Sequence, residues 1–156
     1  MQHVRAVSKD PLPVIGWREW AKLQALGIDQ IKAKIDTGAR TSSLHAHDIQ
    51  EITRGSKKYV RFEVHPEQRS QKGVVVCETR LLEKRKIKDS GGKVTVRPVI
   101  VTPITLGDKT WEIELTLIDR REMGFRMLLG RQAIRHIFFI NPGRSFLTGK
   151  SKRTKK

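Results

Sequence analysis

The sequence predicts a mainly β fold, a closed barrel with one short helix near the C-terminus, from three observations. The segment Ile31–Ile35 alternates apolar and basic residues, which is the period of a half-buried strand. Several later apolar runs are separated by turn signals that contain glycine or proline. The run 131–136 carries good helix formers directly after a glycine, so a short helix is expected there.

The elements follow in order from these signals. The folded part is expected to begin at Val14, after two prolines, and residues 17–26 read as a short strand or turn. The strand over residues 31–35 then leads directly into a tight turn at Asp36. Further strands are expected over residues 59–64, 74–79, 94–101, 111–118 and 138–140, with turns at 65–66, 90–92 and 107–109 and a buried apolar run over 127–130.

The 156 residues fit one domain. We expect an N-terminal extension over residues 1–13, the folded domain over residues 14–148, and a disordered basic tail over residues 149–156. The tail prediction rests on a run of basic residues that has no apolar residue to anchor it.

The charge of the chain is strongly positive. It has 32 Lys plus Arg against 16 Asp plus Glu, a formal net charge of +16. Such an excess attracts anions, so acidic peptides and nucleic acid both become candidate partners.

The single cysteine, Cys77, cannot form an internal disulfide, and the sequence contains no secretory h-region or membrane-spanning apolar run. We therefore expect a cytoplasmic protein without a membrane partner, with Cys77 as a buried residue on a strand.

Asp36-Thr37-Gly38-Ala39 is the segment with the most evident chemistry. It places a carboxylate at the tip of a turn, beside a hydroxyl residue and a glycine that permits close backbone approach. This arrangement suits acid/base catalysis, although the same composition is common in turns without function.

A second segment, Leu128-Leu129-Gly130-Arg131, follows later in the chain, and together the two segments resemble the retropepsins. Residues 86–96, with Gly91 and Gly92 at their centre, occupy the place of the retropepsin flap, a hairpin that closes over the substrate. The longer run over residues 35–46 and the run over 15–20 resemble a bacterial retropepsin-like group labelled ATP-dependent zinc proteases. The likeness covers about residues 14 to 142.

The resemblance implies an aspartic-type peptidase formed by a homodimer, in which each chain contributes one catalytic aspartate. Asp36 would be this aspartate, Thr37 would hydrogen-bond across the dyad, and Gly38 would lie against the substrate backbone. The substrate would contact Ala39, Arg40, Gly91 and Gly92, while Leu128, Leu129, Gly130 and Arg131 would support the catalytic loop from behind.

Arg40 departs from the retroviral pattern, which has an acidic residue at this position to pair with the arginine of the second segment. Arg40 is therefore expected either to face the cleft and bind a substrate carboxylate, or to be exposed without a specific contact. Bacterial members of the group occur with ligases that add glutamate to proteins, so an acidic, glutamate-rich peptide tail is the substrate that the resemblance suggests.

No cofactor is expected. Residues 143–151 resemble a phosphate-binding loop but have five residues between the glycines where the motif has four, so an ATP site is not expected. His45 and His47 are the close histidine pair, with Asp48 or Cys77 as candidate further ligands for zinc. Exposed or hydrogen-bonded histidines are the favoured interpretation of this pair, and His3, His65 and His136 have no partner nearby in sequence.

Two other functions remain open at this point. The basic charge would also suit a noncatalytic β domain that binds RNA, the ribosome or another polyanion, in part through the basic tail. The pair of His45 and His47 would alternatively serve a zinc-dependent hydrolase, which would bind stoichiometric metal and lose activity with a chelator.

Overall fold

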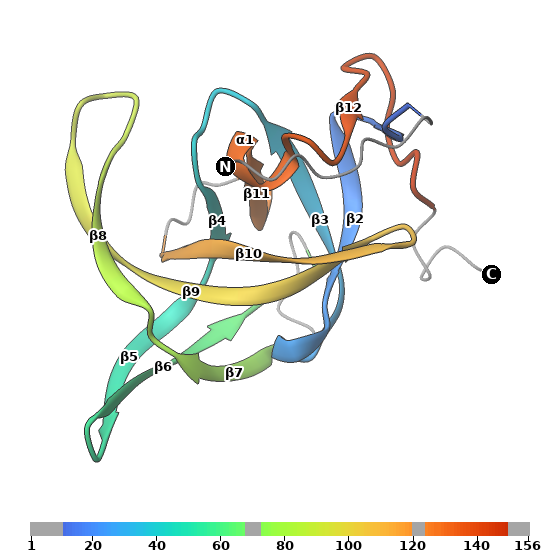
Figure 1. Ribbon diagram of the computed structural model, residues 1–156. Coiled ribbons are helices and arrows are strands. Elements are labelled where there is room, and N and C mark those ends of the chain that lie inside the picture. Colours follow the sequence, from blue (N-terminus) through green and yellow to red (C-terminus); the bar gives the residue numbers. More distant parts are fainter. Residues whose placement is uncertain (1–10, 68–72, 120–123, 150–156) are drawn as a thin grey trace, which may run out of the picture.

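The computed structural model describes residues 11–67, 73–119 and 124–149, and within them the chain is mainly β with one short α-helix near the C-terminus (Figure 1). This confirms the mainly β character and the short helix near the C-terminus that the sequence predicts. The strands are β1 (Val14–Ile15), β2 (Arg18–Leu23), β3 (Ile28–Asp36), β4 (Ser42–His45), β5 (His47–Arg54), β6 (Lys57–Val64), β7 (Val75–Arg80), β8 (Glu83–Lys88), β9 (Val94–Leu106), β10 (Lys109–Ile118), β11 (Met127–Gly130) and β12 (Phe139–Ile140). The helices are the 3-10 turn η1 (Gln24–Leu26) and α1 (Arg131–Ile134).

The largest sheet has seven strands in the order β10-β4-β11-β3-β2-β9-β8. Because β10 also pairs with β9, the pairing of six of these strands returns on itself as a ring, and β8 lies outside the ring along β9. Most neighbours are antiparallel, but β11 runs parallel to β3 and β10 runs parallel to β4. These two parallel pairings bring residues that are distant in sequence to the same end of the sheet.

Two smaller sheets complete the fold. The antiparallel sheet β5-β6-β7 extends from the large sheet at the lower left of Figure 1, and β4 passes into β5 through the single residue Ala46. The strands β1 and β12 form a parallel pair, which joins the first and last strands of the described fold.

The core lies inside the ring of strands. Strand β2 alternates half-buried and buried residues, as a strand with one face toward a core should. Fully buried side chains come from every part of the ring and include Leu23, Ile31, Leu44, Ile104, Leu115 and Leu117. Burial of these apolar groups is the main favourable contribution to the stability of the fold.

A buried carboxylate connects the beginning and the end of the described chain. Glu19 on β2 has no exposed surface, and its oxygens accept hydrogen bonds from the backbone N–H groups of Gly16 (2.6 Å), Leu147 (2.9 Å) and Thr148 (3.0 Å). The hydroxyl of Thr148 donates a fourth bond, of 2.9 Å. The described part of the segment that resembles a phosphate-binding loop, residues 143–149, therefore packs along β2.

Several boundaries differ from the predicted ones. Strand β9 continues past Val101 to Leu106, through Pro103, because its partner β10 extends equally far and holds it in register. Strands β4 and β5 were not expected. All four residues of β4 are buried although three of them are polar, a pattern without strand periodicity.

Residues 1–10 of the predicted extension and 150–156 of the predicted tail lie outside the described residues. Within the described ranges, no helix has the length and apolarity needed to cross a bilayer.

Candidate active site

Asp36 ends the long strand β3 at the start of a tight turn. The backbone N–H of Ala39 donates to the carbonyl of Asp36 (3.1 Å), and the N–H of Gly38 donates to its carboxylate Oδ1 (3.1 Å). A Cβ at position 38 would lie 3.4 Å from the same oxygen. The turn thus fixes one carboxylate oxygen by the backbone and leaves the group half-buried at the end of the strand.

The second predicted segment supports this turn directly. Strand β11 runs parallel to β3 with Gly130 opposite Asp36, and the N–H of Arg131 donates to the carbonyl of Ala39 at 2.8 Å. A Cβ on Gly130 would lie 2.6 Å from the backbone of Thr41 and 2.9 Å from the carbonyl oxygen of Ala39. Only glycine permits this close approach, so the predicted support of the catalytic loop has a clear steric basis.

Side chains hold the remaining polar groups of the loop. The guanidinium of Arg131 donates through Nη1 to the carbonyls of Thr37 (3.3 Å) and Gly38 (3.4 Å), and the N–H of Gly130 donates to the buried hydroxyl of Ser42 (3.0 Å). These bonds hold the backbone of the loop in one conformation, and such preorganisation is what an acid/base site requires.

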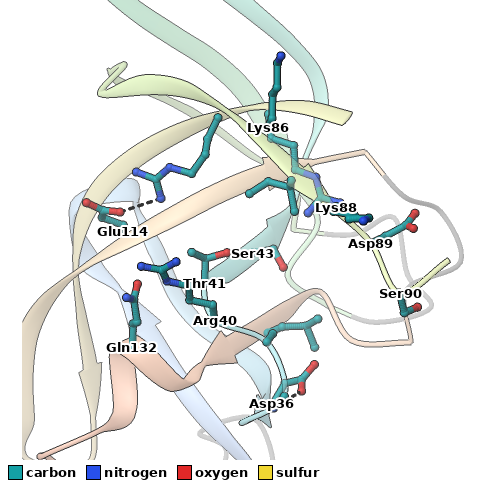
Figure 2. Close-up of a pocket in the computed structure, with 16 residues that line it drawn as sticks. Asp36, Arg40, Thr41, Ser43, Lys86, Lys88, Asp89, Ser90, Glu114 and Gln132 are labelled. Carbon is teal, nitrogen blue, oxygen red and sulfur yellow. Dashed lines mark hydrogen bonds and ion pairs between the residues drawn. The ribbon is translucent and has the colours of Figure 1, made fainter. Parts of the chain in front are cut away.

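A cleft of about 960 Å³ opens beside Asp36. Figure 2 shows the loop residues Arg40 and Thr41 on one side of this cleft and Lys86 and Lys88 of β8 on the other. The described residues that line it are Asp36, Gly38, Ala39, Arg40, Thr41, Ser43, Arg85, Lys86, Ile87, Lys88, Asp89, Ser90, Arg97, Glu114, Leu128 and Gln132. The hairpin of β8 and β9 therefore borders the cleft as a flap would.

The cleft contains the carboxylates of Asp36 and Asp89 and a larger number of cationic side chains. Arg85 bonds to Glu83 and to Glu114, which also lines the cleft, so its charge is compensated. The exposed side chains of Arg40, Lys86 and Lys88 make no ion pair with a described residue. The cleft thus offers three uncompensated cations to a ligand near Asp36.

A family model described as "Retropepsin-like aspartic endopeptidase RimB" matches residues 14–151 of the chain. The chain belongs to the RimB-like family. This confirms the resemblance to retropepsins that the Asp36 and Gly130 segments indicate, and it covers the whole described domain.

Curated relatives of the RimB-like chain carry the name "probable alpha-L-glutamate ligase". The protein from Shewanella halifaxensis is 46% identical over 136 residues, 87% of this chain and 30% of that protein. The protein from Desulfotalea psychrophila is 48% identical over 129 residues, 83% of this chain and 28% of that protein. The chain therefore spans less than a third of the length of these relatives.

A solved structure also resembles the RimB-like chain. The crystal structure of Lpg0085, a protein of unknown function (DUF785) from Legionella pneumophila, has a TM-score of 0.73 and 34% sequence identity. The match covers 87% of this chain and 98% of that one. The fold of the RimB-like chain is therefore shared with an independently folded protein of similar extent.

The structure brings most of the predicted site residues of the RimB-like chain together. Asp36, Gly38, Ala39, Arg40 and Leu128 line the cleft, whereas Leu129 is buried behind it. Gly91 and Gly92 lie in the turn between β8 and β9, beyond the last lining residue of that turn, Ser90.

Sequence reasoning missed other lining residues, among them Ser43, Glu114 and Gln132. Glu114 lies on β10 and its partner Arg85 lies on β8. The two residues meet at the cleft because both strands pair with β9. No local pattern could have indicated these contacts, because they depend on pairings between distant strands.

The histidines of the RimB-like chain have different neighbours from those predicted. His45 and His47 lie at the junction of β4 and β5 with ring centroids 4.5 Å apart, and the carboxylate near them belongs to Asp119. Neither Asp48 nor Cys77 belongs to this group: the Sγ of Cys77 is 3.4 Å from the carbonyl of Leu26. His65 has no partner nearby in sequence, but the fold places its ring 4.5 Å from that of His47.

The environment of His45 and of His65 favours the neutral form of each ring. Burial lowers the pKa of His45, and its neighbours His47 and Arg126 lower it further. Burial likewise lowers the pKa of His65, with a further contribution from His47. Two imidazoles and the carboxylate of Asp119 are a donor set that fits zinc, the metal named in the label of the bacterial group.

Proposed function

We propose that the chain is an aspartic endopeptidase in which two copies each contribute Asp36 to one shared site. The observation that supports this most directly is the Asp36 turn itself, which opens on a cleft and is supported from behind by Gly130 and Arg131. Membership of a family described as aspartic endopeptidases agrees with it.

The proposed chemistry needs two carboxylates that share one proton. Two such groups about 3 Å apart cannot both be ionised near neutrality, so one acts as base and the other as acid. The ionised Asp36 takes a proton from water, and this water attacks the peptide carbonyl. The protonated Asp36 of the second copy stabilises the oxyanion and then gives its proton to the leaving nitrogen. Since each chain supplies one Asp36 turn, the site is complete only in a dimer.

The proposed substrate is an acidic peptide, such as a tail of α-linked glutamates. Arg40, Lys86 and Lys88 are free to bind carboxylates on both sides of the cleft, and a guanidinium can bind a carboxylate in a bidentate manner. The relatives that share this domain are named alpha-L-glutamate ligases, which agrees with a glutamate-containing substrate.

The direct test is cleavage of a peptide that ends in consecutive α-linked glutamates, compared with the same peptide ending in glutamines. The wild-type chain should cleave the glutamate peptide faster, and Asp36→Asn should remove the activity without changing the far-UV circular dichroism. Asp48→Asn is the matched control, because Asp48 is exposed and lies outside the cleft. Full activity of Asp36→Asn would refute the catalytic assignment.

A mixing experiment tests the shared site. When wild-type and Asp36→Asn chains exchange at equal concentrations, a dyad requires the activity per total chain to fall to about one quarter of the wild-type value, since only wild-type pairs are complete. A chain that acts alone would keep about one half of the activity in the same mixture.

Kinetics of Arg40→Ala test the substrate assignment separately. If Arg40 binds a substrate carboxylate, kcat/KM should fall about tenfold to a hundredfold for the glutamate peptide and little for the glutamine peptide. An equal loss on both peptides would exclude this role of Arg40 while leaving the Asp36 proposal intact.

A further inference from the structure

Three side chains that can bind a metal meet at the junction of the large sheet and the three-stranded sheet. His45 ends β4 and His47 begins β5, while Asp119 directly follows β10. The parallel pairing of β10 with β4 sets Ile118 opposite His45, and this register brings Asp119 to the histidine pair. The cluster is therefore a product of the fold and joins three strands.

His45 is buried with an unused donor atom. Its side chain is 1% exposed, and Nε2 has no hydrogen-bond partner among the described residues. The nearest carboxylate oxygen, Oδ1 of Asp119, is 3.7 Å away, which is too long for a hydrogen bond. A buried polar atom without a partner costs about 1 to 3 kcal/mol, so a ligand at this position would remove an unfavourable contribution.

The spacing of the three donors is close to that of a metal site. Oδ1 of Asp119 is 3.7 Å from Nε2 of His45 and 3.6 Å from Nδ1 of His47, and all three donor atoms lie within 4.8 Å of one another. Ligand distances of about 2.0 to 2.1 Å in a tetrahedral zinc site correspond to roughly 3.4 Å between donors. Small side-chain rotations are therefore sufficient to surround one ion.

The charges around the cluster act in both directions. Asp119 attracts a cation, whereas Nη1 of Arg126 lies 3.4 Å from Nδ1 of His45 and repels one. A metal ion on Nε2 of His45 leaves the ring proton on Nδ1, which faces Nη1 of Arg126, so this guanidinium has to turn away from the ring when the ion binds. The Nε of Arg126 has no hydrogen-bond partner among the described residues. The ring of His65 lies beside that of His47, and Oε1 of Glu63 is 4.0 Å from Nε2 of His65.

The cluster is separate from the cleft at Asp36. Gly130, at one end of β11, pairs with Asp36, whereas the N–H of His45 donates to the carbonyl of Arg126, just before the other end. The four residues of β11 have a length of about 13 Å, which separates the histidine cluster at one end from Asp36 at the other. Neither His45, His47 nor Asp119 lines the cleft.

We propose that His45, His47 and Asp119 bind one divalent transition-metal ion, of which Zn²⁺ is the best match, and that this ion links the large sheet to the β5-β6-β7 sheet. Two imidazoles and one carboxylate suit Zn²⁺, and imidazole also suits Co²⁺. The three ligands leave the fourth position of a tetrahedral ion to water. None of them lines the cleft, so the proposal is independent of the function proposed for Asp36.

Calorimetry of the metal-free full chain with Zn²⁺ tests the site. We expect one Zn²⁺ per chain and a higher Tm in its presence. With Co²⁺ as probe, visible absorption bands of a four-coordinate ion should appear at the same stoichiometry. Asp119→Asn and His47→Gln should each weaken Zn²⁺ binding at least about tenfold, since each removes one ligand. Arg126→Gln should strengthen binding, because it removes the repelling cation.

Asp48→Asn is the matched control, since it makes the same chemical change one residue from His47 and retains a residue type that tolerates the left-handed backbone at this position (φ 53°). It should bind Zn²⁺ as the wild type does. Absence of stoichiometric binding to the wild-type chain would refute the proposal. Wild-type affinity in both Asp119→Asn and His47→Gln would also refute it, because the ion would then be bound elsewhere.

Discussion

At the scale of single residues, the buried carboxylate of Glu19 holds two distant segments of the described chain together. Its two oxygens accept three backbone N–H groups and one hydroxyl, and two of the donor residues, Leu147 and Thr148, come from the last described segment. Loss of this acceptor would leave several donors without a partner in the interior.

We predict that Glu19→Gln lowers the free energy of unfolding by at least about 2 kcal/mol, because the amide NH₂ group replaces one acceptor and faces donors. Denaturant unfolding followed by tryptophan fluorescence measures this change. Glu112→Gln is the control, an identical change at an exposed position of β10, and should alter stability by less than about 0.5 kcal/mol. Equal effects of the two substitutions would contradict the role of Glu19.

Cys77 allows a second prediction at this scale. Burial raises the pKa of its thiol from the ordinary value of 9.0 to about 11. The reactive thiolate is therefore about a hundredfold less abundant at pH 8 than in an exposed cysteine. We expect alkylation by iodoacetamide to be slower than that of a model thiol by at least this factor in the folded chain. Unfolding in denaturant should restore the ordinary rate, and fast labelling of the folded chain would contradict the burial.

The individual residues also show where sequence reasoning succeeds. The resemblance of two short segments to the retropepsins predicted that Gly130 lies behind the Asp36 turn, and the strand pairing places the two residues opposite each other. Asp119 was not predicted as a neighbour of His45, and Ser42 was not predicted as the acceptor for Gly130. Both contacts arise from strand register, which a single sequence does not specify.

At the scale of elements, β11 and the Asp36 turn behave as one unit because of the missing side chain of Gly130. We predict that Gly130→Ala destabilises the fold by about 1 to 3 kcal/mol, since the added Cβ would meet the backbone of Thr41 and Ala39, which cannot move aside as a side chain would. The peptidase activity proposed for Asp36 should fall more than the stability alone explains, because the turn moves with β11.

Thermal unfolding and peptide cleavage at a temperature well below the Tm measure the two effects of Gly130→Ala. Gly124→Ala is the control, since a Cβ at position 124 would meet no atom within 4 Å. Wild-type stability of Gly130→Ala would contradict this prediction, because it would show that β11 can move away from the loop without a loss of free energy of unfolding.

The elements themselves were predicted unevenly. The alternation of Ile31–Ile35 and the glycine pair at 91–92 predicted β3 and the β8-β9 hairpin, because local periodicity and turn chemistry determine such elements. Strand β4 was not predicted, because it lies between β10 and β11 and is buried on both faces. A strand buried on both faces shows no alternation of apolar and polar residues.

At the scale of the whole molecule, the formal net charge of +16 predicts a nonspecific attraction to polyanions. We predict that its affinity for single-stranded RNA falls steeply with salt. Removal of residues 150–156 should make the slope of log K against log salt smaller by about 0.7 for each phosphate that the tail neutralises. Filter binding over a range of salt concentrations measures the slope for the full chain and for the truncated one.

Binding that persists at high salt in the truncated chain would instead support a specific polyanion site on the folded domain. This outcome would favour the noncatalytic function that the composition alone allows. Cleavage of the glutamate peptide by the same truncated chain would show that the two properties are separable.

The parallel pair of β1 and β12, together with the bonds of Glu19, places the two ends of the described chain side by side. We therefore expect the fold to depend on which strands pair, and not on their order along the chain. A circularly permuted form of residues 11–149, joined by a linker between these two ends and opened at the exposed turn Gly55–Ser56, should retain every pairing of the ring. The same geometry suits a module that can be carried within a longer polypeptide without a change in its own architecture.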